Sequence, residues 1–356
     1  MAVVQPKRLY WDLTHMGRAF PDGIGRFVCA MAAAEFALPS VYLLHPRLID
    51  GGLHRVLSNL PGTCLIARKR PGGHLFWKRS WDQLLPEPGI VFAPANFHEP
   101  TLMPTIVVVH DTIPYDDPAY HRFQHLSRSR YGGLLQRADV VLAASDYTAS
   151  RIAALFPSIA AVRRIDQALF PEPAVSKPTS APADPYYLFV GGAEPRKRLE
   201  DAVALASSLD DAALVVIGGD FGRRRVADLV RSWSGKRPLI QVPGCDDAQL
   251  AWYYRHCRAL LYPTRMEGFG LPALECLRSG RPVVARPLSS LPEVLGDFAI
   301  WDDFSVRADP GPLRQRIAGW TATDDLRAHL SRFSWQQSRD RMALIVREVV
   351  DRCGRG

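Results

Sequence analysis

The sequence predicts an α/β protein built from two Rossmann-like, doubly wound domains. In both halves of the 356-residue chain, short apolar runs rich in β-branched residues alternate with longer helical patterns. These runs are continuously apolar, as expected for parallel strands that are buried on both faces. A proline-rich segment separates the halves, and the length allows two domains of roughly 150 residues each.

Eight strands and a closing helix carry this prediction. The expected strands are residues 3–13, 40–45, 105–111, 139–146, 186–192, 213–219, 258–264 and 281–287. Helical patterns between them include residues 222–232 and 248–256. The last segment begins with a capping box, Ser334 and Gln337, and continues as an amphipathic helix. Because ligands of such folds bind beyond the carboxyl ends of the strands, the residues that follow each strand are the candidates for a site.

Proline density sets the expected domain boundaries. Residues 171–185 hold five prolines, which cannot continue a helix or a central strand, so this segment is interpreted as a semi-rigid linker. We therefore expect a first domain over residues 1–170, a second over 186–332 and a closing helix over 333–356.

The formal charge of +8 favours an anionic partner, either phosphates or an acidic membrane surface. Residues 66–79, IARKRPGGHLFWKR, set aromatic and aliphatic side chains among five basic residues, which suits a lipid headgroup layer. A solvated basic loop with one buried tryptophan is the alternative. Nucleic acid is not expected as a partner, because no helix-turn-helix, RNP or zinc-finger signature is present.

The sequence also favours a cytoplasmic location. No apolar run is long enough to cross a bilayer, and the amino-terminal segment lacks a secretory leader. The six cysteines are scattered without a CxxC pair, which is typical of reduced, buried thiols and not of disulfides or a zinc site.

The strongest functional signal follows the expected strand 258–264. There Gly268 and Gly270 permit close backbone approach, and Pro272 suits the first turn of a helix. The amides of that helix start form an anion site. Glu267 lies in the loop and Glu275 is expected in the first helical turn, and such carboxylates accept paired hydrogen bonds from a ribose diol or a hexose.

A second signal follows the strand 186–192, where Arg196, Lys197 and Arg198 are consecutive. Three cations at a strand-to-helix turn repel one another unless an anion lies there, and a pyrophosphate is the natural counterion. A basic helix start facing solvent is the alternative, which the helix dipole disfavours.

These segments resemble the retaining GT-B glycosyltransferases of family GT4. EGFGLPALE is similar to the E-x7-E segment of that family, and VGGAEPRKRL to its VGxxEPRKN segment. DGIGRF, VVVHDTIPYDDPAYH and RADVVLAASDYTASRI are similar to its TGIGR, HDxIP and ADxVIAVSxxT segments. The resemblance covers most of the chain, and EPRK with E-x7-E in this order is its most specific part.

The resemblance implies a GT-B fold, in which two domains face each other across a cleft and the last helix returns to the first domain. It implies that Glu275 holds the nucleotide ribose and that Glu267 holds the donor-sugar hydroxyls. Arg196 and Lys197 would neutralise the departing diphosphate, and with Glu267 and His110 they form the expected catalytic set. The expected donor-binding residues further include Gly23, Gly25, Gly192, Gly268, Phe269, Gly270 and Leu271.

On the acceptor side the resemblance implies His110 and Asp111, to which we add His15 in the first loop. The alternative for His110 is a histidine packed in the core. For His15, a site role and a core position both stay open. No metal or other cofactor is expected, because protein cations and amides can stabilise the leaving phosphate and no D-x-D triplet is present. In the family the leaving phosphate is thought to take the acceptor proton.

Four departures from the family pattern stand out. Arg265 and Met266 replace a common Leu-Tyr pair, Arg198 replaces the usual Asn, and Arg286 stands where a small residue is common. The stretch AVRRIDQALFPEP lacks the VxPNG segment, which puts a nucleotide contact from that turn in doubt. The extra arginines either bind an acidic sugar or an acidic acceptor, or they are surface substitutions without a role in binding.

The predicted function is a metal-independent, retaining glycosyltransferase of bacterial polysaccharide or O-antigen assembly. The EPRK segment is similar to that of mannosyl- and rhamnosyltransferases, so GDP-mannose is the first expected donor and UDP-hexoses come next. A lipid-linked saccharide at the inner face of the membrane is the expected acceptor. A nucleotide-sugar 2-epimerase of the same architecture and a non-catalytic binding subunit are the alternatives.

Overall fold

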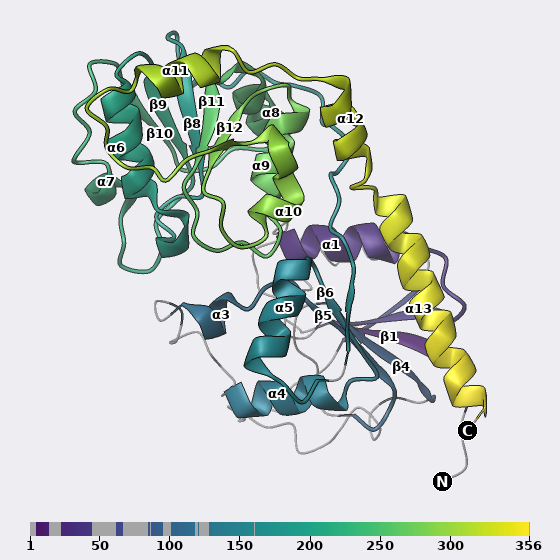
Figure 1. The fold of residues 1–356 in the computed structure, drawn as a ribbon. Coiled ribbons are helices and arrows are strands. Elements are labelled where there is room, and N and C mark those ends of the chain that lie inside the picture. Colours follow the sequence, from purple (N-terminus) through teal and green to yellow (C-terminus); the bar gives the residue numbers. More distant parts are fainter. Residues whose placement is uncertain are drawn as a thin grey trace. The chain divides into compact units, whose positions relative to one another are not determined.

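The computed structural model divides the chain into two compact units, each built around one parallel sheet (Figure 1). Unit 1 comprises residues 1–168 and 334–356, and unit 2 comprises residues 169–333. The structure describes residues 5–13, 23–44, 62–66, 85, 87–94, 101–117, 120, 128–159 and 161–355.

The sheet of unit 1 has the strand order β3-β2-β1-β4-β5-β6-β7, with every described pair parallel. The strands are β1 (Arg8–Asp12), β2 (Ser40–Leu44), β3 (Thr63–Ile66), β4 (Gly89–Ala93), β5 (Thr105–Val109), β6 (Val140–Ala143) and β7 (Val162–Arg164). The helices are α1 (Gly23–Ala32), α3 (Ile113–Asp116), α4 (Arg128–Arg137), α5 (Asp146–Leu155) and α13 (Trp335–Arg355).

The closing helix α13 belongs to unit 1, as the resemblance implies. It packs beside α1 (Figure 1), where Trp335 contacts Phe27 edge-on with ring centroids 5.9 Å apart. The Ser338 hydroxyl donates to the backbone carbonyl of Asp166 at 2.8 Å. An apolar stripe including Met342 and Val346 is fully buried, so the amphipathic pattern read from the sequence fixes how this helix docks.

The sheet of unit 2 has the order β10-β9-β8-β11-β12-β13, also parallel throughout. Its strands are β8 (Tyr186–Val190), β9 (Ala213–Ile217), β10 (Leu239–Val242), β11 (Ala259–Tyr262), β12 (Val283–Ala285) and β13 (Ile300–Trp301). Its helices are η4 (Pro195–Lys197), α6 (Leu199–Leu209), α7 (Val226–Leu229), α8 (Asp247–His256), α9 (Leu271–Arg278), α10 (Leu291–Leu295), η5 (Gly296–Phe298), α11 (Gly311–Ala318) and α12 (Asp324–Ser331).

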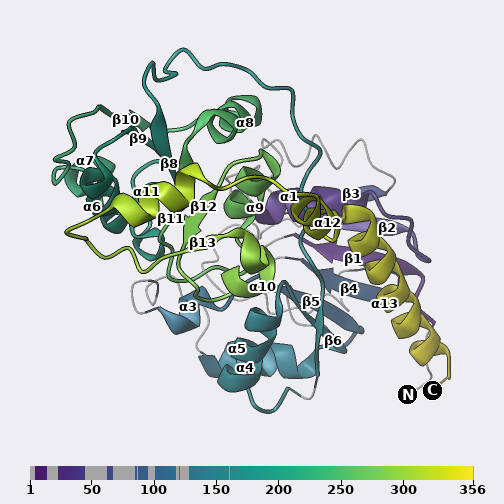
Figure 2. The ribbon, with the colours of Figure 1, turned by 45° about the horizontal axis from the view of Figure 1, so that its top comes forward.

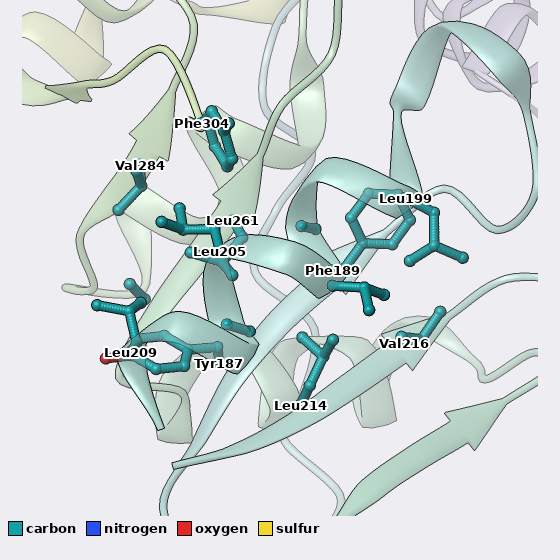
Figure 3. Close-up of a cluster of buried hydrophobic side chains, with 14 of the residues drawn as sticks. Tyr187, Phe189, Leu199, Leu205, Leu209, Leu214, Val216, Leu261, Val284 and Phe304 are labelled. Carbon is teal, nitrogen blue, oxygen red and sulfur yellow. The ribbon is translucent and has the colours of Figure 1, made fainter. Parts of the chain in front are cut away.

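Helices cover both faces of this second sheet, with α6 and α11 on one face and α8 and α9 on the other (Figure 2). On the first face, α6 lays Leu205 and Leu209 against strand residues such as Phe189 and Leu261 (Figure 3). All four side chains are fully buried. Because both faces are covered, the central strands β8, β9 and β11 are apolar throughout, which is the pattern that predicted them.

The expected α/β architecture with two doubly wound domains is confirmed, but several element predictions were incomplete. Strands β3, β4, β7, β10 and β13 were not predicted. The helix expected over residues 222–232 is wrong, since only Val226–Leu229 is helical. Gly222 has φ +59°, and the Asp220 carboxylate accepts the Val226 amide at 2.8 Å, which delays the helix start.

The proline-rich segment packs on unit 2. Ser176 donates its amide to the Ala248 carbonyl at 3.1 Å, and the Ser180 hydroxyl lies 2.9 Å from the Tyr253 hydroxyl. Glu172 forms an ion pair with Arg255 at 2.6 Å. The structure thus groups this segment with α8 and its surroundings.

Candidate functional site

The candidate site lies where the strand order of unit 2 reverses. Strand β8 pairs with β9 along one edge and with β11 along the other, so the strand order changes direction at β8. In open α/β sheets, ligands bind outside the carboxyl ends of the strands at this switch point. The two segments singled out in the sequence follow β8 and β11, so the topology brings them together.

A tight glycine turn begins the first of these loops. Gly192 has φ +59°, and a Cβ at this position would lie 2.2 Å from the Gly219 carbonyl oxygen, which follows β9. The Ala193 amide donates to the same oxygen at 2.9 Å. Only glycine fits here, and the turn directs the chain into the short helix η4 that carries Arg196 and Lys197.

Glu267 is the centre of the site and is almost completely buried. Its Oε1 atom accepts hydrogen bonds from Lys197 Nζ at 2.7 Å, the Tyr262 hydroxyl at 2.8 Å and the Thr264 hydroxyl at 2.9 Å. Its Oε2 atom lies 2.7 Å from a terminal nitrogen of Arg196. The two predicted cations and the first predicted carboxylate therefore form one cluster.

Arg196 is held in place by a second carboxylate. Glu194 accepts from Arg196 Nε at 2.8 Å and from one terminal nitrogen at 3.0 Å. The other terminal nitrogen binds Oε2 of Glu267 and donates to the Met266 carbonyl at 2.9 Å. The guanidinium thus forms three hydrogen bonds and an ion pair within the protein.

Lys197 lies against Tyr262. Its Nζ atom donates to the Tyr262 hydroxyl at 3.1 Å and lies 5.0 Å from the ring centroid. Because the same hydroxyl donates to Glu267, its single proton has a defined direction.

Burial and charge act in opposite directions on the carboxylate of this cluster. Burial alone would raise the pKa of Glu267, but Arg196 and Lys197 lower it to about 2. Burial lowers the pKa of Lys197, and the neighbouring Arg196 lowers it further, against the pull of Glu267. Glu267 is therefore ionised at neutral pH and fixes a compact set of charges.

The start of α9 supplies amides next to Glu267. Gly270 caps the helix with φ +98°, and Pro272 occupies the first turn. Within the part of the chain that the structure describes, the amides of Phe269 and Gly270 have no hydrogen-bond acceptor. Such free amides at the positive end of a helix bind anions.

Glu275 lies in the second turn of α9, just beyond the first turn in which it was expected. It is the fifth residue of Leu271–Arg278, so its expected position in the first turn is corrected. The side chain is half-buried, and Oε2 accepts from the Tyr254 hydroxyl at 3.2 Å. Tyr254, on α8, therefore orients the carboxylate that is expected to hold the ribose.

The remaining expected donor residues lie on unit 2 or at the start of α1. Gly268 and Leu271 flank the amides described above. Gly23 and Gly25 lie in the first turn of α1. Contacts of these glycines with a diphosphate stay a prediction.

His110 lies in unit 1, immediately after β5, and is buried. Its Nε2 atom lies 2.6 Å from the Pro94 carbonyl, and the Gln167 amide nitrogen lies 3.0 Å from Nδ1. These partners fix the neutral tautomer with the proton on Nε2, and burial lowers the pKa to about 4. The geometry fits the core alternative, and a catalytic role stays a prediction.

Asp111 is half-buried and accepts the Ile113 amide at 3.1 Å, at the start of α3. His15 and the basic residues 67–79 lie outside the described residues. Among the residues that are described, no group of three or more His, Cys, Asp or Glu side chains is arranged to hold a metal ion. In the same residues, no helix is both long and apolar enough to span a bilayer.

The residues that position the charged groups were not predicted from the sequence. Tyr262 and Thr264 end the expected strand 258–264 and were taken as strand residues without a role. Ser289 and Ser290 hold the backbone of Glu267, accepting its amide and donating to its carbonyl, each at 3.0 Å. No local pattern marks these serines, because their partner lies more than 20 positions earlier.

Two doubly wound domains, with a cationic loop and an E-x7-E segment at the switch point of the second, fit the expected GT-B fold. The family model "Glycosyl transferases group 1" matches residues 173–332, which are nearly all of unit 2. The expected resemblance to this glycosyltransferase family is thus confirmed over unit 2.

Two curated relatives from Escherichia coli align with much of the chain. The O-antigen chain mannosyltransferase B is 27% identical over 267 residues, which cover 68% of this chain and 70% of that protein. The serotype-specific mannosyltransferase WbdA is also 27% identical over 267 residues. That alignment covers 65% of this chain and 32% of WbdA, so the chain spans about a third of this relative.

Solved structures share the fold over the whole chain. Sucrose-phosphate synthase from Thermosynechococcus elongatus has a TM-score of 0.69 at 16% identity and covers 96% of this chain and 99% of its own. Anabaena HepE, solved with UDP and glucose, has a TM-score of 0.66 at 14% identity, with the same coverage. At these identities the likeness concerns the fold alone.

Proposed function

We propose that the protein transfers a hexose from a nucleotide diphosphate sugar to a saccharide acceptor, with retention of the anomeric configuration. The observation that carries this proposal is the buried cluster of Glu267, Arg196 and Lys197 at the switch point of unit 2. The cluster combines fixed cations, which suit a diphosphate, with a carboxylate, which suits sugar hydroxyls.

The chemistry requires positive charge where the leaving group forms. Glycosyl transfer passes through an oxocarbenium-like state while negative charge grows on the departing phosphate. Lys197, which uses two of its three N–H donors within the cluster, would turn its third toward that phosphate. The free amides of Phe269 and Gly270 would bind the same group, and each such donor contributes about 10²–10³ in rate at comparable sites.

The two carboxylates would bind the two ends of the donor. Glu275 would accept the ribose hydroxyls, oriented by Tyr254, and Glu267 would face the transferred sugar. We propose that no metal ion takes part, since Arg196, Lys197 and the start of α9 supply the charge that a metal would otherwise provide. The leaving phosphate would take the acceptor proton, so that no enzymic nucleophile is needed.

Mannose is the proposed sugar and GDP-mannose the proposed donor. The support is the match to two O-antigen mannosyltransferases, together with the EPRK segment. A lipid-linked saccharide is the proposed acceptor, and residues 66–79 are the proposed contact with an anionic membrane surface. UDP-hexoses are the second choice of donor.

A transfer assay tests the proposal. Purified protein is incubated with GDP-mannose, GDP-glucose, UDP-glucose or UDP-N-acetylglucosamine, with and without mannose-terminated lipid-linked oligosaccharides, and products are analysed by NMR. We expect an α-mannoside from GDP-mannose, and less than 1% of that rate from the Glu267→Gln variant. A β-mannoside would overturn retention, whereas conversion of a UDP-sugar without acceptor would support an epimerase instead.

A further inference from the structure

Two arginines that depart from the family pattern share one carboxylate. Arg198 binds Asp201 through Nε at 3.1 Å and through a terminal nitrogen at 2.8 Å. Arg286, the residue after β12, binds the same carboxylate, with a terminal nitrogen 2.6 Å from Oδ2. Asp201 and Arg286 are only 15% and 17% exposed, so solvent screens this interaction little.

The same network reaches both loops of the site. Arg198 directly follows Lys197, and its backbone has φ +55°, a conformation that is costly for arginine and persists only where the surroundings hold it. Arg286 donates to the carbonyl of Pro263 at 3.0 Å, four residues before Glu267. One guanidinium thus connects the end of the Lys197 loop with the beginning of the Glu267 loop.

Further contacts fix the guanidinium of Arg286. Its Nε atom and one terminal nitrogen donate to the Asp303 carbonyl at 3.3 and 3.0 Å. Its Cζ atom lies 5.4 Å from the centroid of the Phe304 ring. The planar guanidinium is therefore held by hydrogen bonds in its plane and by the Phe304 ring. A flexible lysine ammonium does not reproduce these contacts.

We propose that Arg286 is a positioning residue that, through Asp201 and Arg198, sets the distance between Lys197 and Glu267. Only the expected effect of this network on turnover rests on the proposed function. It also assigns two of the three extra arginines: Arg198 and Arg286 are bound within the protein and do not read an acidic sugar. A displacement of catalytic groups by about 1 Å lowers rates about 100-fold in other enzymes, so a loosened network lowers turnover.

A matched pair of variants isolates the role of position. Arg286→Ala removes the network, and Asp201→Asn removes its central charge with little change in shape. Arg258→Ala removes another Arg–Asp pair, with Asp211, which lies at the amino ends of β11 and β9 in the same sheet. The control therefore loses an ion pair of the same chemistry, far from the loops that follow the strands.

Hydrogen exchange provides a test that does not depend on the proposed function. The Arg265 amide donates to the Arg196 carbonyl at 2.9 Å, which joins the two loops directly. We expect Arg286→Ala and Asp201→Asn to accelerate exchange at least tenfold in both segments, 194–201 and 263–268, and Arg258→Ala to leave both unchanged. The inference is overturned if one of the two segments exchanges at the wild-type rate in both Arg286→Ala and Asp201→Asn. If Arg286→Ala does not fold, Asp201→Asn decides.

Steady-state kinetics give the second readout. With donor and acceptor that the wild type uses, Arg286→Ala is expected to lower kcat at least tenfold while the donor KM stays within threefold. Arg286→Lys is expected to recover less than a third of the lost rate, and Arg258→Ala to stay within twofold of the wild type. Equal losses from Arg286→Ala and Arg258→Ala would mean that the network only stabilises the fold. A wild type without transferase activity contradicts the proposed function and leaves the exchange result to decide this inference.

Discussion

A single hydroxyl group, that of Tyr262, orients the charged side chains of this site. Tyr262 accepts from Lys197 and donates to Glu267, so its oxygen lies between the cation and the carboxylate. No pattern in the sequence reveals this, since Tyr262 is read as one more apolar residue of a strand. The charged residues were predicted from their spacing, whereas the groups that orient them depend on tertiary contacts.

The effect of that hydroxyl is measurable. Tyr262→Phe removes the hydrogen bonds of this hydroxyl to Lys197 and to Glu267. A single hydrogen bond to a charged group contributes about 1.5–3 kcal/mol, so we expect kcat to fall at least about 10–100-fold. Lys197→Met removes the cation itself and is expected to cost about 10²–10³ in kcat. Rates at saturating donor measure both, with Tyr253→Phe as the control hydroxyl on α8. A Tyr262→Phe rate within twofold of the wild type would contradict the role of this hydroxyl.

The buried histidine predicts a pH dependence of stability. Burial lowers the pKa of His110 to about 4 in the folded protein, whereas the unfolded chain keeps the ordinary value near 6.5. The unfolded state therefore binds more protons between these values, and the free energy of unfolding falls as the pH decreases through this window. The slope from this one group is about 1.4 kcal/mol per pH unit.

Urea unfolding at pH 7.0, 6.0 and 5.0 measures this slope. We expect the wild type to lose stability over this range and His110→Gln to lose less, so that the difference between the two proteins narrows toward pH 5. If the free energies of unfolding of the two proteins changed equally with pH, the imidazole of His110 would be protonated in the folded state as readily as in the unfolded chain. His110 would then again be a candidate acid or base.

At the level of the elements, most continuous apolar runs were predictable and half-exposed ones were not, although the fully buried strand β4 was also missed. Strands β5, β6, β8, β9 and β11 follow from continuous apolar residues. By contrast, β10 leaves most of its residues partly exposed, and β13 has two residues, so neither gives a recognisable pattern. The helix expected over 222–232 was wrong because a side-chain bond from Asp220 competes with the helix start.

The glycine turn after β8 gives an element-scale prediction. Gly192→Ala places a methyl group 2.2 Å from the Gly219 carbonyl oxygen at a positive φ, so we expect a loss of about 3 kcal/mol or more. Gly244→Ala is the control, since a Cβ there meets nothing within 4 Å, and about 1 kcal/mol or less is expected. Thermal unfolding of both variants checks the difference, and equal melting temperatures would contradict the backbone argument.

For the whole molecule, the sequence predicted two doubly wound units, because they follow from patterns repeated over many residues, whereas the return of the last helix was implied by the family resemblance. It did not predict that residues 171–185 pack on unit 2, since the partners of Ser176 and Ser180 lie about 70 residues later. Unit 2 carries Arg196, Lys197, Glu267 and Glu275 together, and all four come from loops and helices at one switch point.

Isothermal titration of GDP into the full-length protein tests this placement most directly. We expect one saturable site in the wild type, binding at least tenfold weaker in Glu275→Gln and in Lys197→Met, and unchanged binding in Arg258→Ala. Binding of equal strength in all four proteins, or no binding of GDP, UDP, ADP or dTDP to the wild type, would contradict a nucleotide diphosphate site at these two loops.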